Sequence, residues 1–418
     1  MAFSRLVPSQ VREAFRWDST AVLLAGVYAG MTVPFLAVIA RDRLHATPLQ
    51  IAFMTSAPFA SYLFSLFWAA RIERRGALPY LVGSAVAARG LLLAMAAAVN
   101  APVFVLIVVA STMAAPVAVP AYNVVMREIY PDAWRGRLMG LVRIGRVAAA
   151  IVGALLAGWL LHALSHRVVF PIAAVIGIVG ALCWLRLRTG RAARPPDGDH
   201  VSPLQALSTL WRDRRFAWYS AGYFIFGFGN LILSPVIPVF QVDVLKITPM
   251  WVGLLTTTSA ALGGLLYYVW GRRVDERGPF RSLLVGFAAM AVVPPVYALA
   301  HHVPTLLIAA AAAGIAQPCT ELSWINAVMR FGREGEVARY SALHVTLLGI
   351  RGLIAPWVGG ALMVVWPTLR PIFWLGLGVL LVGWAVMAAF VWRHARPGSD
   401  LGTRPRPRIV RSEHPDNQ

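Results

Sequence analysis

Runs of about twenty apolar residues fill this chain, and no other feature restricts its fold as strongly. A helix needs ~20 residues to cross the ~30 Å hydrocarbon core of a bilayer. Of the 418 residues, 58 % are hydrophobic and only 13 % are charged, whereas soluble domains carry about 25 % charged residues. Because backbone amides in lipid must be satisfied within their own segment, spans of this kind are helices. The sequence therefore predicts an all-α polytopic membrane protein.

Twelve such runs follow one another along the chain. We expect them to cross the membrane at residues 20–40, 49–70, 80–99, 102–126, 137–162, 167–187, 216–241, 249–270, 281–301, 304–329, 337–364 and 370–392. With this assignment, 29 of the 38 Lys and Arg residues lie on the side that holds both termini, and five lie on the other side. Short loops rich in Arg stay in the cytoplasm, so both termini are predicted to be cytoplasmic and the protein to lie in the plasma (inner) membrane.

The net charge of +20 follows from this topology. Basic loops beside a membrane attract anionic lipid headgroups, so membrane lipids are the expected partners and nucleic acid is not. The two cysteines lie inside predicted spans, which does not indicate a disulfide framework.

A short basic loop occurs twice, at corresponding places in the two halves of the chain. Residues 68–79 read WAARIERRGALP, and residues 270–279 read WGRRVDERGP. Aligning the glycines Gly76 and Gly278 gives an offset of 202 residues. Other text recurs at offsets of 201 to 203, so we infer a duplicated six-helix unit. The expected parts are an interfacial N-terminal helix, a six-helix bundle, a cytoplasmic linker, a second six-helix bundle and a disordered cytoplasmic tail, at residues 1–19, 20–187, 188–215, 216–392 and 393–418.

Six spans, a basic linker, six more spans and a loop repeated between spans 2–3 and 8–9 resemble the major facilitator superfamily of secondary transporters. The resemblance covers about residues 18–393. It implies an MFS fold of twelve transmembrane helices in two pseudo-symmetric six-helix bundles, which move about a central cavity. It also implies a monomer that needs no cofactor or metal.

The repeated loop carries that family's signature in part, and the resemblance implies that it acts as a conformational latch. The second copy keeps Gly271, Asp275 and Gly278. The first copy keeps Arg74 and Gly76, with Glu73 where the family has Asp. We expect Gly271 to let its helix approach a neighbour closely. The alternative is that these charges only fix topology and solvate a tight turn.

Other motifs of the family are missing from the chain. Span 4 lacks the Arg of drug/proton antiporters, span 5 lacks their glycine/proline signature, and the Pro-Glu-Ser text of sugar porters is absent after span 6. The sequence therefore assigns the chain to neither subgroup.

Ionisable residues inside spans cost ~2.5–3.5 kcal/mol each on insertion scales and usually face a cavity or a partner. Glu321 is the one carboxylate well inside a span, ~14 Å from the end of span 10 at 1.5 Å per residue. It could take up and release a proton or contact the solute. The alternatives are a structural pair with Arg351 or a merely hydrated acid.

Four arginines and a histidine complete this set. Arg351 either pairs with Glu321 or holds an anionic solute through its planar fork, and Arg146 is expected to mirror it in the first half. Arg143 is expected to snorkel, and Arg89 to bind a neighbour's carbonyls. For His344, a hydrogen-bonded position between helices is favoured over a proton relay. Four arginines against one carboxylate favour an organic anion or a zwitterion as the solute.

Polar residues of the spans either line the cavity or bond between helices. They are Tyr28, Thr32, Asn123, Asn230, Gln317, Ser323, Trp324 and Asn326. Prolines that interrupt spans 1, 4, 7 and 10 are expected to kink or unwind them. These are Pro34, Pro116, Pro120, Pro235, Pro238 and Pro318.

These observations predict a proton-coupled, alternating-access carrier of a small organic solute, acting as an efflux antiporter. The alternatives are a symporter or uniporter that takes up an organic anion, and a non-transporting sensor or assembly factor with the same fold. An enzyme is not expected, because the sequence shows no catalytic triad, no metal-ligand spacing and no phosphate-binding glycine loop.

Overall fold

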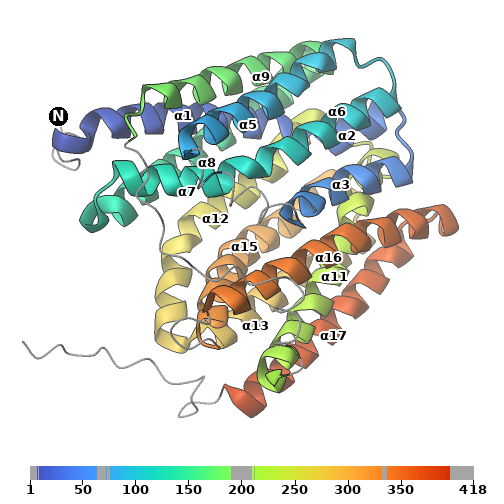
Figure 1. The fold of residues 1–418 in the computed structure, drawn as a ribbon. Coiled ribbons are helices and arrows are strands. Elements are labelled where there is room, and N and C mark those ends of the chain that lie inside the picture. Colours follow the sequence, from blue (N-terminus) through green and yellow to red (C-terminus); the bar gives the residue numbers. More distant parts are fainter. Residues whose placement is uncertain are drawn as a thin grey trace, which may run out of the picture.

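The computed structural model describes residues 7, 9–63, 72, 76–189, 210, 212–331 and 337–395, and all the regular structure in these residues is helical. Eleven helical segments in this part of the chain are long and apolar enough to cross a membrane. They run side by side, with the N-terminal half above the C-terminal half in Figure 1. Most of the expected linker and tail, together with Glu73 and Arg74, lie outside the described residues.

Six crossings form the first half. Their helices are α1 (Arg12–Thr32) and α2 (Leu36–Asp42), α3 (Pro48–Leu63), α5 (Ala77–Leu91) with η3 (Leu92–Ala97), α6 (Ala101–Ala114), η4 (Ala115–Val117) and α7 (Ala118–Ile129), α8 (Asp132–Ala163), and α9 (His166–Cys183) with η5 (Trp184–Arg186). The expected separate helix at the N-terminus is, from Arg12 onward, the first turns of α1 itself.

The second half repeats this order. Its helices are α11 (Arg214–Asp243), α12 (Pro249–Arg277), α13 (Pro279–Met290) and α14 (Val293–Leu299), η6 (Val303–Thr305) and α15 (Leu306–Met329), α16 (Val337–Val365), and α17 (Arg370–His394). The predicted spans coincide with these helices. Several helices extend beyond the apolar run, because polar residues at its edge continue the helix into the aqueous boundary.

Proline interrupts the helices unequally. The first crossing breaks into α1 and α2 around Pro34, and the fourth passes through the short 3-10 segment η4 between α6 and α7. In contrast, Pro235 and Pro238 lie inside the continuous helix α11, and Pro318 lies inside α15. The predicted interruption of the helices therefore occurs in the first half. In the second half, the prolines lie within helices that stay continuous.

Equivalent arginines join two crossings within each half. In the first half, Arg167 at the start of α9 donates to the carbonyl of Ala98 at 3.3 Å. In the second half, Arg370 at the start of α17 donates to Ala298 and Ala300 at 2.6 and 2.9 Å. Each Arg thus binds carbonyls at the end of its half's third crossing, where the helix has no intrahelical donors left. These matching bonds confirm the predicted duplication.

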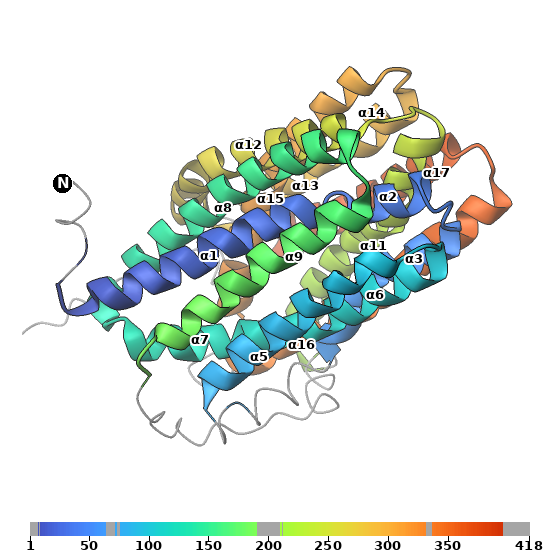
Figure 2. The ribbon, with the colours of Figure 1, turned by 90° about the horizontal axis from the view of Figure 1, so that it is seen from above.

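The halves meet unevenly along their length. At the end of the bundle away from the N-terminus, where Figure 2 shows the turn between α2 and α3, one buried apolar core continues through both halves. At the other end, here called the terminal end, each half has a buried core of its own. The halves are therefore joined by apolar packing at the end opposite the termini.

Small residues allow helices of the two halves to touch. A Cβ added at Gly253 of α12 would lie 2.6 Å from the Ala154 carbonyl of α8, and one at Gly158 would lie 3.0 Å from the Pro249 carbonyl. On the other side, α3 packs against α16, where Phe53 and Trp357 rings lie 5.9 Å apart. Close backbone contact at small residues is the usual way that helices associate in lipid.

Within the first half, Gly30 sets the spacing of α1 and α8. A Cβ at this position would overlap the carbonyl oxygen of Ala150, so α1 cannot keep its place beside α8 with a larger residue. Gly30→Ala is expected to destabilise the protein by about 1–3 kcal/mol, the usual cost of overpacking. The midpoint of thermal unfolding in detergent measures this change.

Gly83→Ala is the matched control, because a Cβ at Gly83 of α5 meets nothing within 4 Å. This variant should unfold at the wild-type temperature or slightly above it. Equal midpoints for the two variants would show that the α1–α8 contact does not limit stability.

Candidate functional site

A cavity of ≈ 260 Å³ lies inside the second half, between α11, α12, α13, α15 and α16. Its polar wall consists of Asn230, Ser259, Gln317, Thr320 and Arg351. Three of these, Asn230, Gln317 and Arg351, are among the residues singled out from the sequence. The size is near the lower end of ligand pockets, ~300–1,000 Å³, which suits a small solute.

Arg351 is the charged residue of this wall, and it is only 7 % exposed. Its Nη1 donates to the Tyr223 carbonyl at 2.5 Å, and its guanidinium lies 4.8 Å from the centre of the Tyr223 ring. Gly227, one turn further along α11, leaves room for it, because a Cβ there would overlap Nη1. Its Nε is buried without a hydrogen-bond partner among the described residues.

His344 lies behind this wall in an aromatic cluster. Its ring stacks on Trp324 at 4.8 Å with an interplanar angle of 9°, and it meets the edge of Tyr223 at 4.6 Å. Its Nε2 is buried and has no hydrogen-bond partner in the described part of the chain. The expectation of a hydrogen-bonded histidine is therefore wrong for this nitrogen, and ring stacking holds the side chain.

Glu321 forms a link between the two halves. It is paired with Arg143 of α8, and it also accepts a hydrogen bond from Tyr267 of α12. At 1.5 Å per residue, these three residues lie ~12–17 Å from the terminal ends of their helices. The alternative that Glu321 pairs with Arg351 is therefore wrong. The prediction that Arg143 snorkels is also wrong, because packing of the halves brings Arg143 of α8 to Glu321 of α15.

This ion pair is partly accessible. The Arg143 side chain is 60 % exposed and the Glu321 side chain 33 %, so solvent or solute can reach both where the halves separate. Tyr267, which donates to the carboxylate and accepts from Arg143 at 3.1 Å, was missed by the sequence analysis. Its depth in α12, matching that of Glu321 in α15, is the signal that could have found it.

The remaining polar residues of α7 and α15 serve their own helices or stand alone. Asn326 Nδ2 donates to the Leu322 carbonyl at 2.8 Å, while Ser323 is buried with an unpartnered Oγ. Asn123, the repeat partner of Asn326, is exposed on α7. No group of three or more His, Cys, Asp or Glu side chains suited to a metal occurs among the described residues.

Arg89 has the predicted structural role in the first half. It is buried and donates to the Gly177 carbonyl of α9, and its guanidinium lies 5.3 Å from the centre of the Tyr28 ring. Thr32 donates back to the Tyr28 carbonyl at 2.8 Å. Tyr28 and Thr32 thus take part in contacts within and between helices near the α1–α2 break.

Arg146, expected to mirror Arg351, has different surroundings. Its backbone carbonyl lies against Gly26 of α1, whereas the guanidinium of Arg351 lies against Gly227 of α11. The Arg146 side chain is exposed, and that of Arg351 is buried. The mirror relation between the two arginines therefore stays a prediction.

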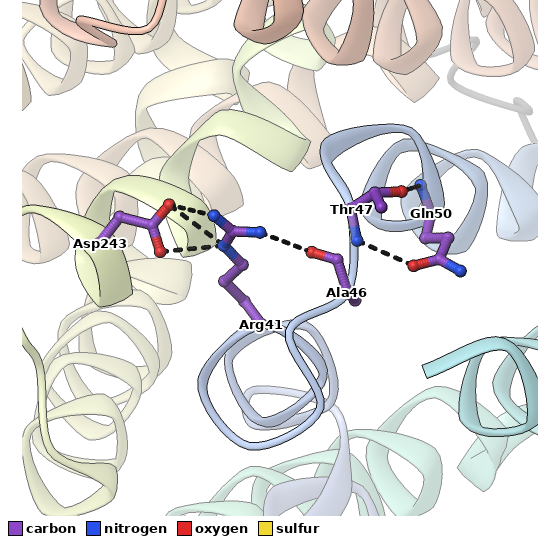
Figure 3. A network of polar contacts seen from close by, with 5 residues as sticks. All are labelled: Arg41, Ala46, Thr47, Gln50 and Asp243. Carbon is purple, nitrogen blue, oxygen red and sulfur yellow. Dashed lines mark hydrogen bonds and ion pairs between the residues drawn. The ribbon is translucent and has the colours of Figure 1, made fainter. Parts of the chain in front are cut away.

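A second ion pair links the halves at the end opposite the termini (Figure 3). Arg41 at the end of α2 binds Asp243 at the end of α11 through two nitrogens, at 2.6 and 2.9 Å. Its third nitrogen donates to the Ala46 carbonyl at 2.9 Å. The sequence analysis missed this pair, although Arg41 is one of only five basic residues expected on that side.

The sequence itself matches a known family over most of its length. The model of the Major Facilitator Superfamily matches residues 19–293 and, in a second match, residues 222–414. The chain belongs to the Major Facilitator Superfamily. No curated protein matches it in sequence.

Solved structures of this superfamily share its fold. A mutant of the nucleoside transporter NupG has a TM-score of 0.79 at 13 % identity, covering 90 % of this chain and 99 % of that one. A bacterial homologue of the human lysosomal transporter Spinster, in an inward-facing and occupied conformation, has a TM-score of 0.69 at 14 % identity, covering 92 % and 98 %. As a superfamily member, this chain is a multi-pass membrane transporter of a small solute and not an enzyme.

The repeated superfamily loop has the same backbone in both halves where it is described. Gly76 and Gly278 both have positive φ, +89° and +82°, a conformation that favours glycine. Asp275 is exposed at the end of α12. Gly271 was expected to let its helix approach a neighbour closely. This expectation is wrong, because a Cβ at Gly271 would meet nothing within 4 Å.

Asp18 is a buried carboxylate that the sequence analysis placed outside the membrane. It accepts hydrogen bonds from Tyr130 at 2.9 Å and from the Trp184 indole at 3.2 Å, with a longer one from Tyr122 at 3.3 Å. These donors come from the fourth and sixth crossings, so Asp18 ties three segments of the first half together at the terminal end.

Loss of the Arg41–Asp243 pair should loosen the end opposite the termini. A hydrogen bond to a charged group contributes about 1.5–3 kcal/mol, and Asp243→Asn removes the charge. Spin labels on cysteines introduced at Val99 and Leu299, exposed positions in the two halves, report the separation in a background without the native cysteines. A longer distance component should appear in the variant.

Asp132→Asn is the control for this measurement. Asp132 pairs with Arg135 one turn along the same helix, α8, so its loss should leave the separation of the halves unchanged. Identical distance distributions for Asp243→Asn and wild type would contradict a role of the Arg41–Asp243 pair in closing this end.

Proposed function

We propose that this protein is a proton-coupled, alternating-access carrier of a small organic solute. In this proposal it lies in the plasma (inner) membrane, with both termini in the cytoplasm. The observation that carries the proposal is the position of Glu321. Its carboxylate, expected from sequence as the coupling group, joins the two halves through Arg143 and Tyr267.

A proton on Glu321 changes this link directly. The ionised carboxylate makes charge-assisted hydrogen bonds, which are about twice as strong as neutral ones. Protonation removes the negative charge and leaves Arg143 without its ionic partner. Because Arg143 and Glu321 belong to different halves, the change alters the free-energy difference between bundle arrangements, which is how a bound proton shifts a conformational population.

The arrangement of the halves supports an opening at the terminal end. The apolar core and the Arg41–Asp243 pair join the halves at the opposite end, while the halves have separate cores at the terminal end. With cytoplasmic termini, this arrangement admits solute from the cytoplasm. Closure of that end is the step in which the loops at Gly76 and Gly278, with Glu73, Arg74 and Asp275, would act as the latch.

Efflux by antiport is the first candidate for the direction and class of transport. In this scheme, a proton on Glu321 is exchanged for a solute in the same space between the halves. Uptake of an organic anion is the second candidate, because Arg351 lines the cavity and has no carboxylate partner among the described residues.

Proton-coupled transport can be measured in proteoliposomes that contain a pH-sensitive dye. The test solutes are a small carboxylate, an amine and a nucleoside, the last because the fold neighbour NupG is a nucleoside transporter. We expect one of them to move protons across the membrane with wild-type protein. Glu321→Gln should reduce this proton movement at least tenfold while keeping solute exchange.

Arg143→Gln separates coupling from simple structure. If Glu321 carries the proton, this variant keeps proton movement with altered rates, whereas Glu321→Gln loses it. Wild-type levels of proton movement in Glu321→Gln would refute the coupling role, and absence of flux for every solute class would contradict the carrier.

A further inference from the structure

We propose that the cavity of the second half binds the carboxylate of a small organic acid that has an apolar or aromatic body, with Arg351 as the residue that holds the carboxylate. This inference rests on the proposed carrier function and names its substrate class. It concerns one site in one half, whose lining includes neither Glu321 nor Arg143.

The first argument is the charge of Arg351. The side chain is 7 % exposed, and its contacts are the Tyr223 carbonyl and ring. A carbonyl and an aromatic face stabilise a cation without neutralising it. The described residues supply Arg351 with no carboxylate, and its Nε is buried and unpartnered. A buried charge without a counter-ion is costly by several kcal/mol, and an anionic ligand removes that cost.

The second argument is that the guanidinium is fixed in place. Gly227 provides the space it occupies, and the Tyr223 carbonyl holds Nη1 at 2.5 Å. A planar fork held in this way can bind the two oxygens of a carboxylate together. Pre-organisation of this kind reduces the entropy lost when a ligand binds.

The third argument is the composition of the cavity wall. No acidic residue of the described part of the chain lines it, and its other polar side chains are neutral: Tyr223, Asn230, Ser259, Gln317 and Thr320. A cationic solute would meet only repulsion from Arg351. Glu321 follows Thr320 directly in α15 but is engaged by Arg143 and Tyr267, so it does not neutralise the cavity.

The rest of the wall indicates the body of the ligand. Phe226 and Phe287 stack with ring centres 3.6 Å apart, and Met290 lies beside them on the wall. These apolar groups favour a ligand whose hydrocarbon chain or ring they can bury. A fully polar acid has no such group. A volume of ≈ 260 Å³, near the lower end of ligand pockets, fits a compact monocarboxylate.

The candidate site takes all its residues from the second half. The cavity lies wholly within helices of that half, and Arg351 lines it. In the first half, Arg146 has an exposed side chain, and the buried Arg89 is bonded to the Gly177 carbonyl. Arg351 is therefore the buried arginine that a ligand in this cavity would meet.

A matched series of probes tests the proposal on the purified full-length protein in detergent. The probes are phenylacetate, phenylacetamide and phenethylamine, which have similar shapes and carry a negative charge, no charge and a positive charge. Ligand-dependent thermal stabilisation is the readout. We expect phenylacetate to stabilise the wild type with a dissociation constant of ~1 mM or below, and the amide and amine to bind at least tenfold more weakly.

The variants identify the residue responsible. Arg351→Gln should lose the preference for the acid, and Gly227→Ala should weaken acid binding by displacing the guanidinium. Arg281→Gln, an exposed arginine at the start of α13, should bind as the wild type does. If Arg351→Gln does not fold, the wild-type series and Gly227→Ala still decide the question.

The outcome is separate from that of the carrier proposal, because binding in detergent requires neither a proton gradient nor transport. Equal stabilisation by acid and amide, acid binding unchanged by Gly227→Ala, or no stabilisation by phenylacetate would each overturn the carboxylate site. Proton movement in proteoliposomes could still be observed in that case, and it alone decides the coupling role of Glu321.

Discussion

A charge inside a bilayer must find a partner, and this requirement organises the protein. Three of the four membrane-embedded arginines meet it in different ways. Arg89 binds a carbonyl within its own half, whereas Arg143 binds a carboxylate of the other half. Among the described residues, Arg351 finds a carbonyl and a ring but no carboxylate. A partner in the same half gives rigidity, a partner in the other half makes the charge sensitive to bundle movement, and an incomplete set of partners leaves capacity for a ligand.

The two halves share a scaffold and differ in chemistry. Carbonyl-binding arginines at the starts of α9 and α17 occur in both, and so does the glycine turn with positive φ. The described cavity and the inter-half carboxylate Glu321 belong to the second half. Its buried Arg351 lines that cavity, whereas the buried Arg89 of the first half binds a carbonyl. Duplication therefore accounts for the fold, and departures from it account for the candidate site. A search for asymmetry between repeats is a direct way to locate function in such a chain.

The crossings and the duplication could be predicted because apolar runs and repeated text are local signals. The partner of Glu321 could not, since the choice between Arg143 and Arg351 depends on which helices of opposite halves meet. Gly271 shows a related limit: a small residue permits close contact without requiring it. The Arg41–Asp243 pair joins residues 202 positions apart, which is the offset of the repeat. Repeat alignment therefore places both at the end of the first crossing of their half, but it does not show that these two ends meet. Cavity placement of Asn230 and Gln317 depended on helix rotation, which composition does not determine.

Arg41 makes one hydrogen bond that does not depend on Asp243. Its third nitrogen stays on the Ala46 carbonyl, just before Thr47 and Gln50, which bond to each other's backbone amides and fix the start of α3 (Figure 3). This reciprocal capping makes the turn stiff. If Asp243 moves away, the bond to Ala46 therefore keeps the Arg41 guanidinium in the position in which it binds Asp243. In the proposed carrier cycle, reclosure of this end would then require no conformational search by a long side chain, so it could be fast even where opening is slow.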